Sequence, residues 1–355
     1  MTTKTCHSAQ EKYAEPESPD VSARVRISLL GAGNMGTAMA HALASTGHDV
    51  AIWDFFPEVV EDIRERRENR RFLPGVRLAE SIRTVNSPIE CVEGAALVAV
   101  CVPSPFVSST LSQVLPELSK DAILLNIAKG FEPSTRQLLP FFLKRLAEGH
   151  PCVHLAGPVI ANELMRGQAA SIVFASTDAD ASARVAGWFS GRLFQASTTT
   201  DVTGAAFGGI LKNVYAILLG CQETISPNSR NLEAAVLTAS VREMAAIAVV
   251  HGGQPHTIYG LAGLGDLVAT GFSRDSHNRR FGQQLAAGQT VAEIRKEVGW
   301  LPEGVQATHD ACAIAKACGV RAVMAQWVRR TLGGKPPSLS GLLRALRAST
   351  TEVQL

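Results

Sequence analysis

Two lysines and an aspartate stand where charged side chains are costly to place. Lys212 lies in FGGILKNVYAILLG, a segment apolar nearly all round, which predicts a buried helix. A buried ammonium group needs a compensating partner, and YGLAGLGDLVAT offers one in Asp266, with Thr270 four residues further on the same helical face. Lys129 ends the strand-like segment DAILLNIAKG, and a second cation nearby lowers the pKa of a buried lysine. These residues predict a lysine that exchanges a proton near neutral pH, held by Asp266.

Hydrogen-bond donors gather in a second segment. SRDSHNRRFG carries five of them in succession: Ser276, His277, Asn278, Arg279 and Arg280. Such a run can hold an anion. Asn213 follows Lys212 in the same helix, and Gly157, in LAGPVIANE, ends another strand-like segment and offers its backbone to a ligand. We expect a small-molecule substrate to bind among these groups, with Lys129 and Thr270 beside it.

Three glycines could cradle a dinucleotide. Gly31, Gly33 and Gly36 in LLGAGNMGTAMA follow a strand-like segment and open a helical one, and the next strand-like segment ends in Asp54. In that context the first glycine turns the chain, the second admits a pyrophosphate and the third packs helix on strand. An acid at Asp54 accepts hydrogen bonds from ribose hydroxyls and repels a 2′-phosphate, so NAD is expected and NADP is the alternative. The competing interpretation is an ordinary glycine turn with a solvated aspartate.

The elements that must position these residues fall into two parts. Short apolar segments predict strands in a mostly parallel sheet covered on both faces, at 24–33, 48–54, 82–86, 96–103, 121–130, 152–159, 169–176 and 194–200. We therefore expect a doubly wound α/β Rossmann domain over 24–200. Long helical patterns follow and predict an all-α substrate domain over 201–345. Residues 1–23 and 346–355 are expected to be tails, and KPPSLSGLLRALRAS to hold at most one short basic helix on the surface.

Composition narrows the class of protein. The chain has 355 residues, 46% of them hydrophobic. Its 34 basic and 32 acidic side chains nearly balance, so its net charge is small. Nucleic acid is therefore not expected as a partner. The seven cysteines are not paired at metal-ligand or redox-motif spacing, which favours a reducing cytoplasm and no metal. No membrane span is expected, and the very apolar helices of the second domain are compatible with a homodimer.

Several motifs follow one another along the chain in the order found in a known protein family. Over roughly residues 24–330 the chain resembles the NAD(P)-dependent glycerol-3-phosphate dehydrogenases of the bacterial type. The resemblance lies in the motifs GAGNMGTAMA, RFLPG, CVPS, AKGFE, AGPVIANE, DVTGAAFGGILKNVYAI, GLAGLGDLVAT, SHNRRFG and PEGVQA. GGxLKN and GLAGLGDL are far rarer than the nucleotide fingerprint, so the resemblance is specific. It implies a Rossmann domain followed by a helical domain.

The resemblance also implies roles for particular positions. Lys212 would match the catalytic lysine, which takes the C2 hydroxyl proton of sn-glycerol 3-phosphate and returns it when dihydroxyacetone phosphate is reduced. Substrate contacts would come from Lys129, Gly157, Asp266, Ser276 and Asn278. Cofactor contacts would come from Asn34, Met35, Lys129, Ala161 and Glu303.

The chain departs from the family pattern at three positions. His277 replaces an arginine that binds the substrate phosphate in the family, and a neutral imidazole replaces a fixed cation unless His277 is protonated or Arg279 or Arg280 substitutes. Val159 replaces the usual threonine of G-P-T, and Ala239 stands in another arginine position. Three hypotheses remain: the glycerol-3-phosphate enzyme of phospholipid synthesis, a paralogue acting on a related secondary alcohol or polyol phosphate, and a nicotinamide-binding sensor without turnover.

Overall fold

Eight strands form one sheet in the N-terminal part of the chain. The protein is represented by a computed structural model that describes residues 24–350. The strands are β1 (Arg26–Leu30), β2 (Asp49–Trp53), β3 (Arg83–Thr84), β4 (Leu97–Val100), β5 (Ile123–Asn126), β6 (Cys152–Ala156), β7 (Ala170–Ala175) and β8 (Phe194–Thr199). Their order is β3-β2-β1-β4-β5-β6-β7-β8, and the pairs are parallel except β6 with β7. Each of the eight segments expected to form a strand does so, and the sheet is mostly parallel as expected.

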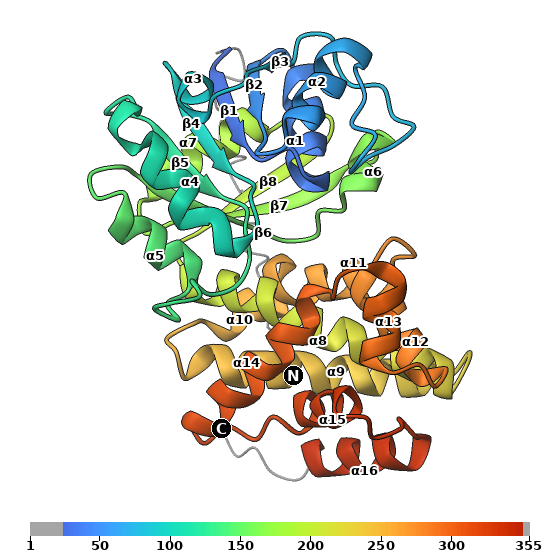
Figure 1. Cartoon of the computed structure of the whole chain (residues 1–355). Coiled ribbons are helices and arrows are strands. Elements are labelled where there is room, and N and C mark those ends of the chain that lie inside the picture. The colour runs from blue at the N-terminus through green and yellow to red at the C-terminus, as the bar shows by residue number, and fades with distance from the viewer. Residues whose placement is uncertain (1–23, 351–355) are drawn as a thin grey trace, which may run out of the picture.

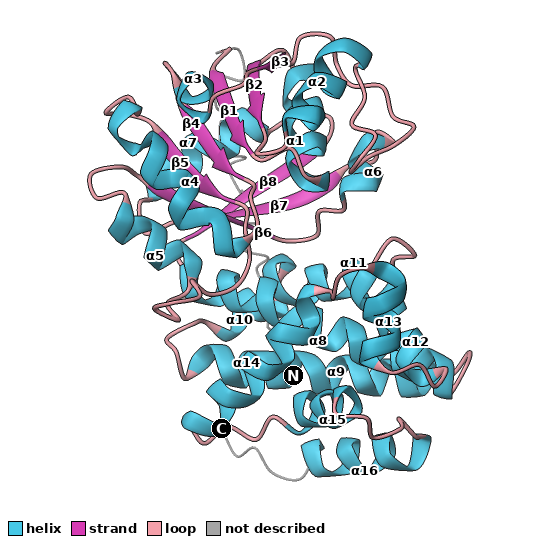
Figure 2. Cartoon of the chain, viewed as in Figure 1, coloured by secondary structure: helices cyan, strands magenta, loops and turns pink. Residues whose placement is uncertain are grey.

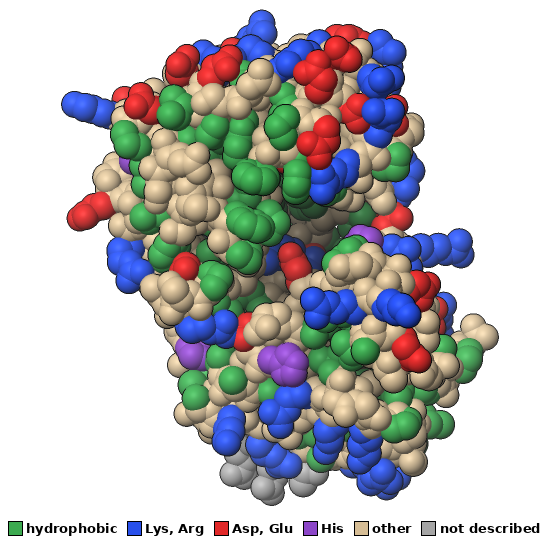
Figure 3. All heavy atoms as spheres, in the orientation of Figure 1, with side chains coloured by type: hydrophobic (Ala, Val, Ile, Leu, Met, Phe, Trp, Pro, Cys, Tyr) green, Lys and Arg blue, Asp and Glu red, His purple; other side chains and the backbone are tan. Residues whose placement is uncertain are grey.

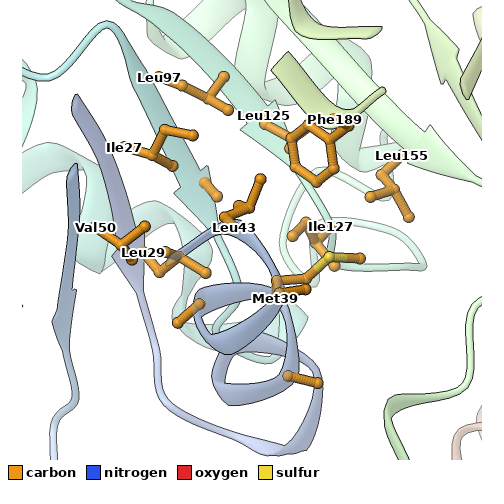
Figure 4. Close-up of a cluster of buried hydrophobic side chains, with 14 of the residues drawn as sticks. Ile27, Leu29, Met39, Leu43, Val50, Leu97, Leu125, Ile127, Leu155 and Phe189 are labelled. Atoms are coloured by element: carbon orange, nitrogen blue, oxygen red, sulfur yellow. The ribbon is translucent and has the colours of Figure 1, made fainter. Parts of the chain in front are cut away.

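Helices cover both faces of this sheet (Figure 2). One face carries α1 (Asn34–Ser45), α2 (Pro57–Arg66), α6 (Ala161–Met165) and α7 (Ala179–Phe189), and the other carries α3 (Pro88–Val92), α4 (Val107–Val114) and α5 (Leu139–Leu146). Figure 4 shows Met39 and Leu43 of α1 among strand side chains such as Leu29 and Leu125. Because both faces are covered, inner strands such as β4 and β5 are buried along their whole length rather than alternating.

The second part of the described chain is helical and is built around α8 (Val202–Ile225) (Figure 1). The remaining helices are α9 (Arg230–Val249), α10 (Pro255–Tyr259), the π-helical turn Leu261–Gly265, α11 (Asp266–Phe272), α12 (His277–Ala286), α13 (Val291–Val298), α14 (Glu303–Ala317), α15 (Val323–Leu332) and α16 (Leu339–Thr350). By length and composition α8 could cross a membrane, but 89% of its most apolar window is buried inside the molecule. It is the core helix of this part.

A glycine in α8 brings the chemistry-bearing elements together. A Cβ atom at Gly208 would stand 2.2 Å from the carbonyl oxygen of Ala262, so only glycine lets the π-helical turn approach α8 this closely. The turn leads directly into α11, whose first residue is Asp266. This close packing therefore sets the distance between Asp266 and the lysine of α8.

The C-terminal end differs from the expectation. The boundary expected at residue 345 falls inside α16, which continues to Thr350. Leu342 and Ala345 are buried against the helical core, so α16 is amphipathic and packed rather than simply solvated. The tails expected at 1–23 and beyond residue 350 lie outside the described residues.

Candidate active site

The glycine loop between β1 and α1 is shaped for a ligand. Gly31 has a φ of +112°, and a Cβ atom there would stand 2.9 Å from the amide nitrogen of Val102, so packing alone requires glycine. A Cβ atom at Gly33 would meet nothing within 4 Å. The packing of the protein therefore does not require a glycine at position 33. A pyrophosphate lying against the loop would require one, because a side chain there would keep it from the backbone. Gly33 is also the N-cap of α1 and provides no side-chain cap, which leaves amide donors for an anion.

Two polar side chains hold this loop in shape. Asp54, at the end of β2, accepts hydrogen bonds from the amides of Ala32 (2.6 Å) and Phe56 (2.9 Å). Asn69 is fully buried and donates to the carbonyl oxygen of Ala32 at 2.7 Å and to Thr37 Oγ1 at 2.8 Å. The carboxylate expected at the ribose therefore also braces the loop. Asn69 was not found from sequence, because no spacing relates it to the glycines.

The other expected cofactor residues are distributed around this loop and the cleft. Asn34 and Met35 are the first residues of α1, with Asn34 exposed and Met35 partly buried. Ala161 begins α6 and is 9% exposed. Glu303 begins α14 in the helical part and is exposed. The loop and the open space at Gly33 thus fit a dinucleotide.

Asp266 is shared by both lysines. Its Oδ1 accepts from Lys212 Nζ, and its Oδ2 accepts from Lys129 Nζ at 3.1 Å. Lys212 also donates to Thr270 Oγ1 at 2.8 Å, one helical turn beyond Asp266. Lys129 follows β5, so this contact joins the sheet to the helical part. The four residues that the sequence suggested for proton chemistry form one bonded cluster.

Burial sets the protonation behaviour of this cluster. It lowers the pKa of Lys212 to about 8; Lys129 lowers this pKa too, while Asp266 opposes the shift. Burial also lowers the pKa of Lys129, but the negative charges of Asp266 and Glu303 outweigh it and the net pKa is raised. Lys129 therefore stays a cation, and Lys212 is the group that can exchange a proton near physiological pH.

Side-chain amides frame the lysine on its helical side. Asn213 Nδ2 donates to Glu303 Oε2 at 3.2 Å, and Asn213 Oδ1 accepts from Asn278 Nδ2 at 2.9 Å. Asn278 Oδ1 in turn accepts from the Gly304 amide at 2.9 Å. These bonds tie α8, α12 and α14 together, so a ligand that touches Asn278 meets a fixed amide.

A cavity of about 340 Å³ opens beside Lys212. It is lined by residues of both parts: Val159, Ile160, Lys212, Thr270, Ser273, Asp275, Ser276, His277, Asn278, Trp300, Pro302 and Glu303. Figure 3 shows the molecule hollowed between its upper and lower parts. This volume suits a small ligand that reaches the lysine from the side of the sheet.

The donor-rich segment at the start of α12 divides between two sides of the helix. Arg280 is exposed, and its Nη2 lies 3.1 Å from Nδ1 of His277, a residue that lines the cavity. Arg279 turns away and forms a 2.6 Å ion pair with Glu223. Trp300 packs edge-on against the His277 ring, with the centroids 4.7 Å apart. Neither arginine is among the residues that line the cavity, but the guanidinium of Arg280 contacts the lining residue His277, whereas that of Arg279 is paired with Glu223.

The surroundings of His277 favour its neutral form. Its burial lowers the pKa of its imidazole, and the positive charge of Arg280 lowers it further, while Asp275 acts in the opposite direction. The lowered pKa disfavours the imidazolium form of His277 as a replacement for an arginine at this position. Trp300, which fixes the ring, was missed from sequence because only the tertiary fold brings α13 and α14 beside α12.

Two further expected substrate residues have clear structural duties. Gly157 has a φ of +95°, and a Cβ atom there would stand 2.9 Å from the Ser171 carbonyl oxygen, so the sheet itself demands glycine. Ser276 is the N-cap of α12, and its hydroxyl accepts from the Arg279 amide at 3.2 Å. Ser276 also lines the cavity. Both positions can contact a ligand while serving the fold.

Comparisons with known proteins agree with this arrangement. The family model described as the N-terminus of NAD-dependent glycerol-3-phosphate dehydrogenase matches residues 26–182, and the model of its C-terminus matches residues 201–339. The glycerol-3-phosphate dehydrogenase (NAD(P)+) of Citrifermentans bemidjiense is 35% identical over 298 residues, which cover 83% of this chain and 89% of that protein. The chain belongs to the NAD-dependent glycerol-3-phosphate dehydrogenase family.

Other members of this glycerol-3-phosphate dehydrogenase family are similar over most of their length. The enzyme of that name from Moorella thermoacetica is 37% identical over 311 residues, 87% of this chain and 92% of that protein. A crystal structure of glycerol-3-phosphate dehydrogenase from Coxiella burnetii superposes with a TM-score of 0.82 at 27% identity, covering 93% of this chain and 99% of that one. The expected fold class, a Rossmann domain followed by a helical domain, is confirmed.

Proposed function

We propose that this family member interconverts sn-glycerol 3-phosphate and dihydroxyacetone phosphate with NAD(H). One observation carries the proposal: a buried lysine with a pKa of about 8 lines a cavity and is held by a carboxylate and a hydroxyl. A lysine that only binds a ligand does not need a lowered pKa. A lysine that donates and accepts a proton near neutral pH does. The names of the relatives supply glycerol 3-phosphate, and removal of a hydride and a proton at its C2 hydroxyl gives dihydroxyacetone phosphate.

A bound nicotinamide would donate a hydride to C2 when the ketone is reduced and accept it from C2 when the alcohol is oxidised. Lys212 Nζ gives its proton to the C2 oxygen as the carbonyl is reduced, and takes a proton from the C2 hydroxyl in the oxidation. Thr270 and Asp266 each bond to Nζ and keep it aimed at the cavity. The ammonium of Lys129 stabilises negative charge that develops on the same oxygen.

Residues of α12 are proposed to hold the phosphate. Arg280 contacts His277 at the cavity wall, whereas Arg279 is paired with Glu223. Asn278 and the first amides of α12 add donors at the helix N-terminus, where an anion is stabilised. We therefore assign to Arg280 the guanidinium role that His277 cannot fill.

We propose NAD as the preferred cofactor, with Gly31, Gly33, Asn34, Met35, Gly36, Asp54, Lys129, Ala161 and Glu303 around it. The Asp54 carboxylate stands at the loop that would meet the adenosine ribose and repels a 2′-phosphate. The relatives' names include both NAD and NADP, so the comparison does not choose between them.

The cellular setting is also proposed. The described cysteines are free, and burial raises the pKa of Cys91 and Cys221 to about 12, so these thiols are unreactive in a reducing cytoplasm. A homodimer through the helical part stays a prediction, to be tested by light scattering of the purified protein.

The test follows NADH oxidation with dihydroxyacetone phosphate, with NADPH, unphosphorylated dihydroxyacetone and larger ketone phosphates assayed in parallel. Efficient turnover of dihydroxyacetone phosphate and weak turnover of dihydroxyacetone support the proposal. A larger ketone phosphate turned over more efficiently would favour the paralogue, and NADH binding without any turnover would favour a sensor.

A further inference from the structure

The last forty described residues carry charge of one sign. Between residues 311 and 350 the sequence has no aspartate or glutamate, and its cations are Lys316, Arg321, Arg329, Arg330, Lys335, Arg344 and Arg347. Acidic side chains outnumber basic ones in the rest of the chain, so this excess is local. Figure 3 shows blue side chains gathered at the lower end of the molecule, where Figure 1 places α15 and α16.

Three of these cations surround a groove. A cavity of about 270 Å³ between α15 and α16 is lined by Arg330, Lys335 and Arg344, together with Ser338 at the start of α16. All three cations are exposed, and no ion pair within residues 24–350 includes any of them. They create a positive potential that no acid on the same segment reduces.

Exposed leucines lie beside these cations. Leu339 and Leu343 stand one helical turn apart on α16 and are 41% and 40% exposed, while Leu342 and Ala345 pack inward. A helix that presents leucines flanked by arginines fits the boundary between lipid headgroups and acyl chains. A nucleic acid fits less well, because Trp327 in the groove is only 5% exposed and offers no face for base stacking.

We propose that α15 and α16 form a docking surface for a bilayer that contains anionic phospholipids. Arg330, Lys335 and Arg344 bind the phosphate groups, and Leu339 and Leu343 enter the interface. The surface lies at the end of the helical part away from the sheet (Figure 1), so docking leaves the cavity beside Lys212 open. This inference goes beyond the proposed reaction and does not depend on it.

The test is sedimentation of the full chain with vesicles of phosphatidylcholine alone or mixed with phosphatidylglycerol. We expect binding only to the anionic vesicles, weakened by salt. The double variant Arg330→Glu and Arg344→Glu reverses two contacts and should lower partitioning by about tenfold or more. The variant Leu339→Gln and Leu343→Gln should leave a weaker binding that salt abolishes completely.

A matched control separates this surface from net charge. Lys120→Glu with Arg192→Glu changes the total charge equally on exposed positions of the sheet part and should bind vesicles as the unmodified protein does. The midpoint of thermal unfolding reports folding for every variant. Equal binding to both vesicle types, or equal loss in the control, would overturn the proposal. So would a surface that binds RNA, inorganic polyphosphate or a second copy of the chain but no vesicles.

Discussion

Two carboxylates are buried in the helical part, and their surroundings differ. Asp266 is 1% exposed and is bonded to two ammonium groups at the wall of a cavity. Glu243, on α9, is 6% exposed and accepts from Tyr215 Oη at 2.8 Å and from the amides of Met324 (2.9 Å) and Ala325 (2.8 Å). The first carboxylate faces cations, and the second faces neutral donors, a tyrosine of α8 and two amides at the beginning of α15.

The difference in surroundings indicates different roles, a chemical one for Asp266 and a structural one for Glu243. Glu243 supplies the cap that the N-terminus of α15 lacks, and its burial raises the pKa of its carboxyl, although the hydrogen bonds oppose that shift. Asp266 holds a lysine whose proton can leave, beside space for a ligand. A buried acid is therefore a sign of function when its partners titrate and face a cavity, and of folding when they do neither.

The largest effect is expected at the lysine. Lys212→Ala removes the proton donor and acceptor, and kcat should fall by about a thousandfold in both directions. NADH binding, followed by fluorescence, should be unchanged because Lys212 lies in the substrate cavity. Lys120→Ala, at an exposed lysine of the sheet part, is the control and should retain full activity.

The comparison itself is tested by matched amide substitutions. Asp266→Asn should lower kcat by about a hundredfold, since Lys212 loses its counter-charge. Glu243→Gln points an amide donor at the amides of α15 and should lower the free energy of unfolding by about 1–3 kcal/mol, with kcat of the folded protein unchanged. The distinction between the two carboxylates fails if Glu243→Gln loses as much kcat as Asp266→Asn.

Substitutions of two adjacent arginines test which residue of α12 binds the substrate phosphate. Arg280→Ala should raise KM for dihydroxyacetone phosphate and lower kcat/KM by about a hundredfold, because a charged hydrogen-bond partner of the phosphate is lost. Arg279→Ala removes only the pair with Glu223 and should leave kcat/KM nearly unchanged. Equal losses from the two variants would show that Arg280 is not the phosphate ligand.

The smallest effect is expected in the sheet part. Asp54→Asn keeps an oxygen for bracing the loop but removes the charge, so the ratio of kcat/KM for NADPH to that for NADH should rise by about tenfold. The ratio cancels any general loosening of the loop. An unchanged ratio would mean that Asp54 acts only as a brace.

Sequence was sufficient where local pattern decides the outcome. Short apolar or β-branched segments located all eight strands. A lysine inside an apolar helix is unusual enough to require a partner such as Asp266. Orientation around a helix was different. Arg279 and Arg280 are neighbours in sequence, and only the packing of α12 on α8 determines which of them pairs with Glu223 and which contacts His277 at the cavity.

Other features depend on contacts between distant segments. The brace between Asn69 and Ala32, and the packing of Trp300 on His277, join segments that no periodicity relates. The extension of α16 past residue 345 follows from burial of Leu342 and Ala345 against the helical core, which a short basic segment does not reveal.

The most direct test of the central claim, that Lys212 carries the proton, is the pH dependence of kcat/KM in both directions. Reduction needs the ammonium, so its rate should fall as the pH rises through about 8; oxidation needs the free amine, so its rate should rise through the same pH. In Asp266→Asn the break for reduction should move to lower pH, because Asp266 raises the pKa of Lys212. Profiles that are flat between pH 7 and 9, or that break alike in both directions, would contradict the assignment.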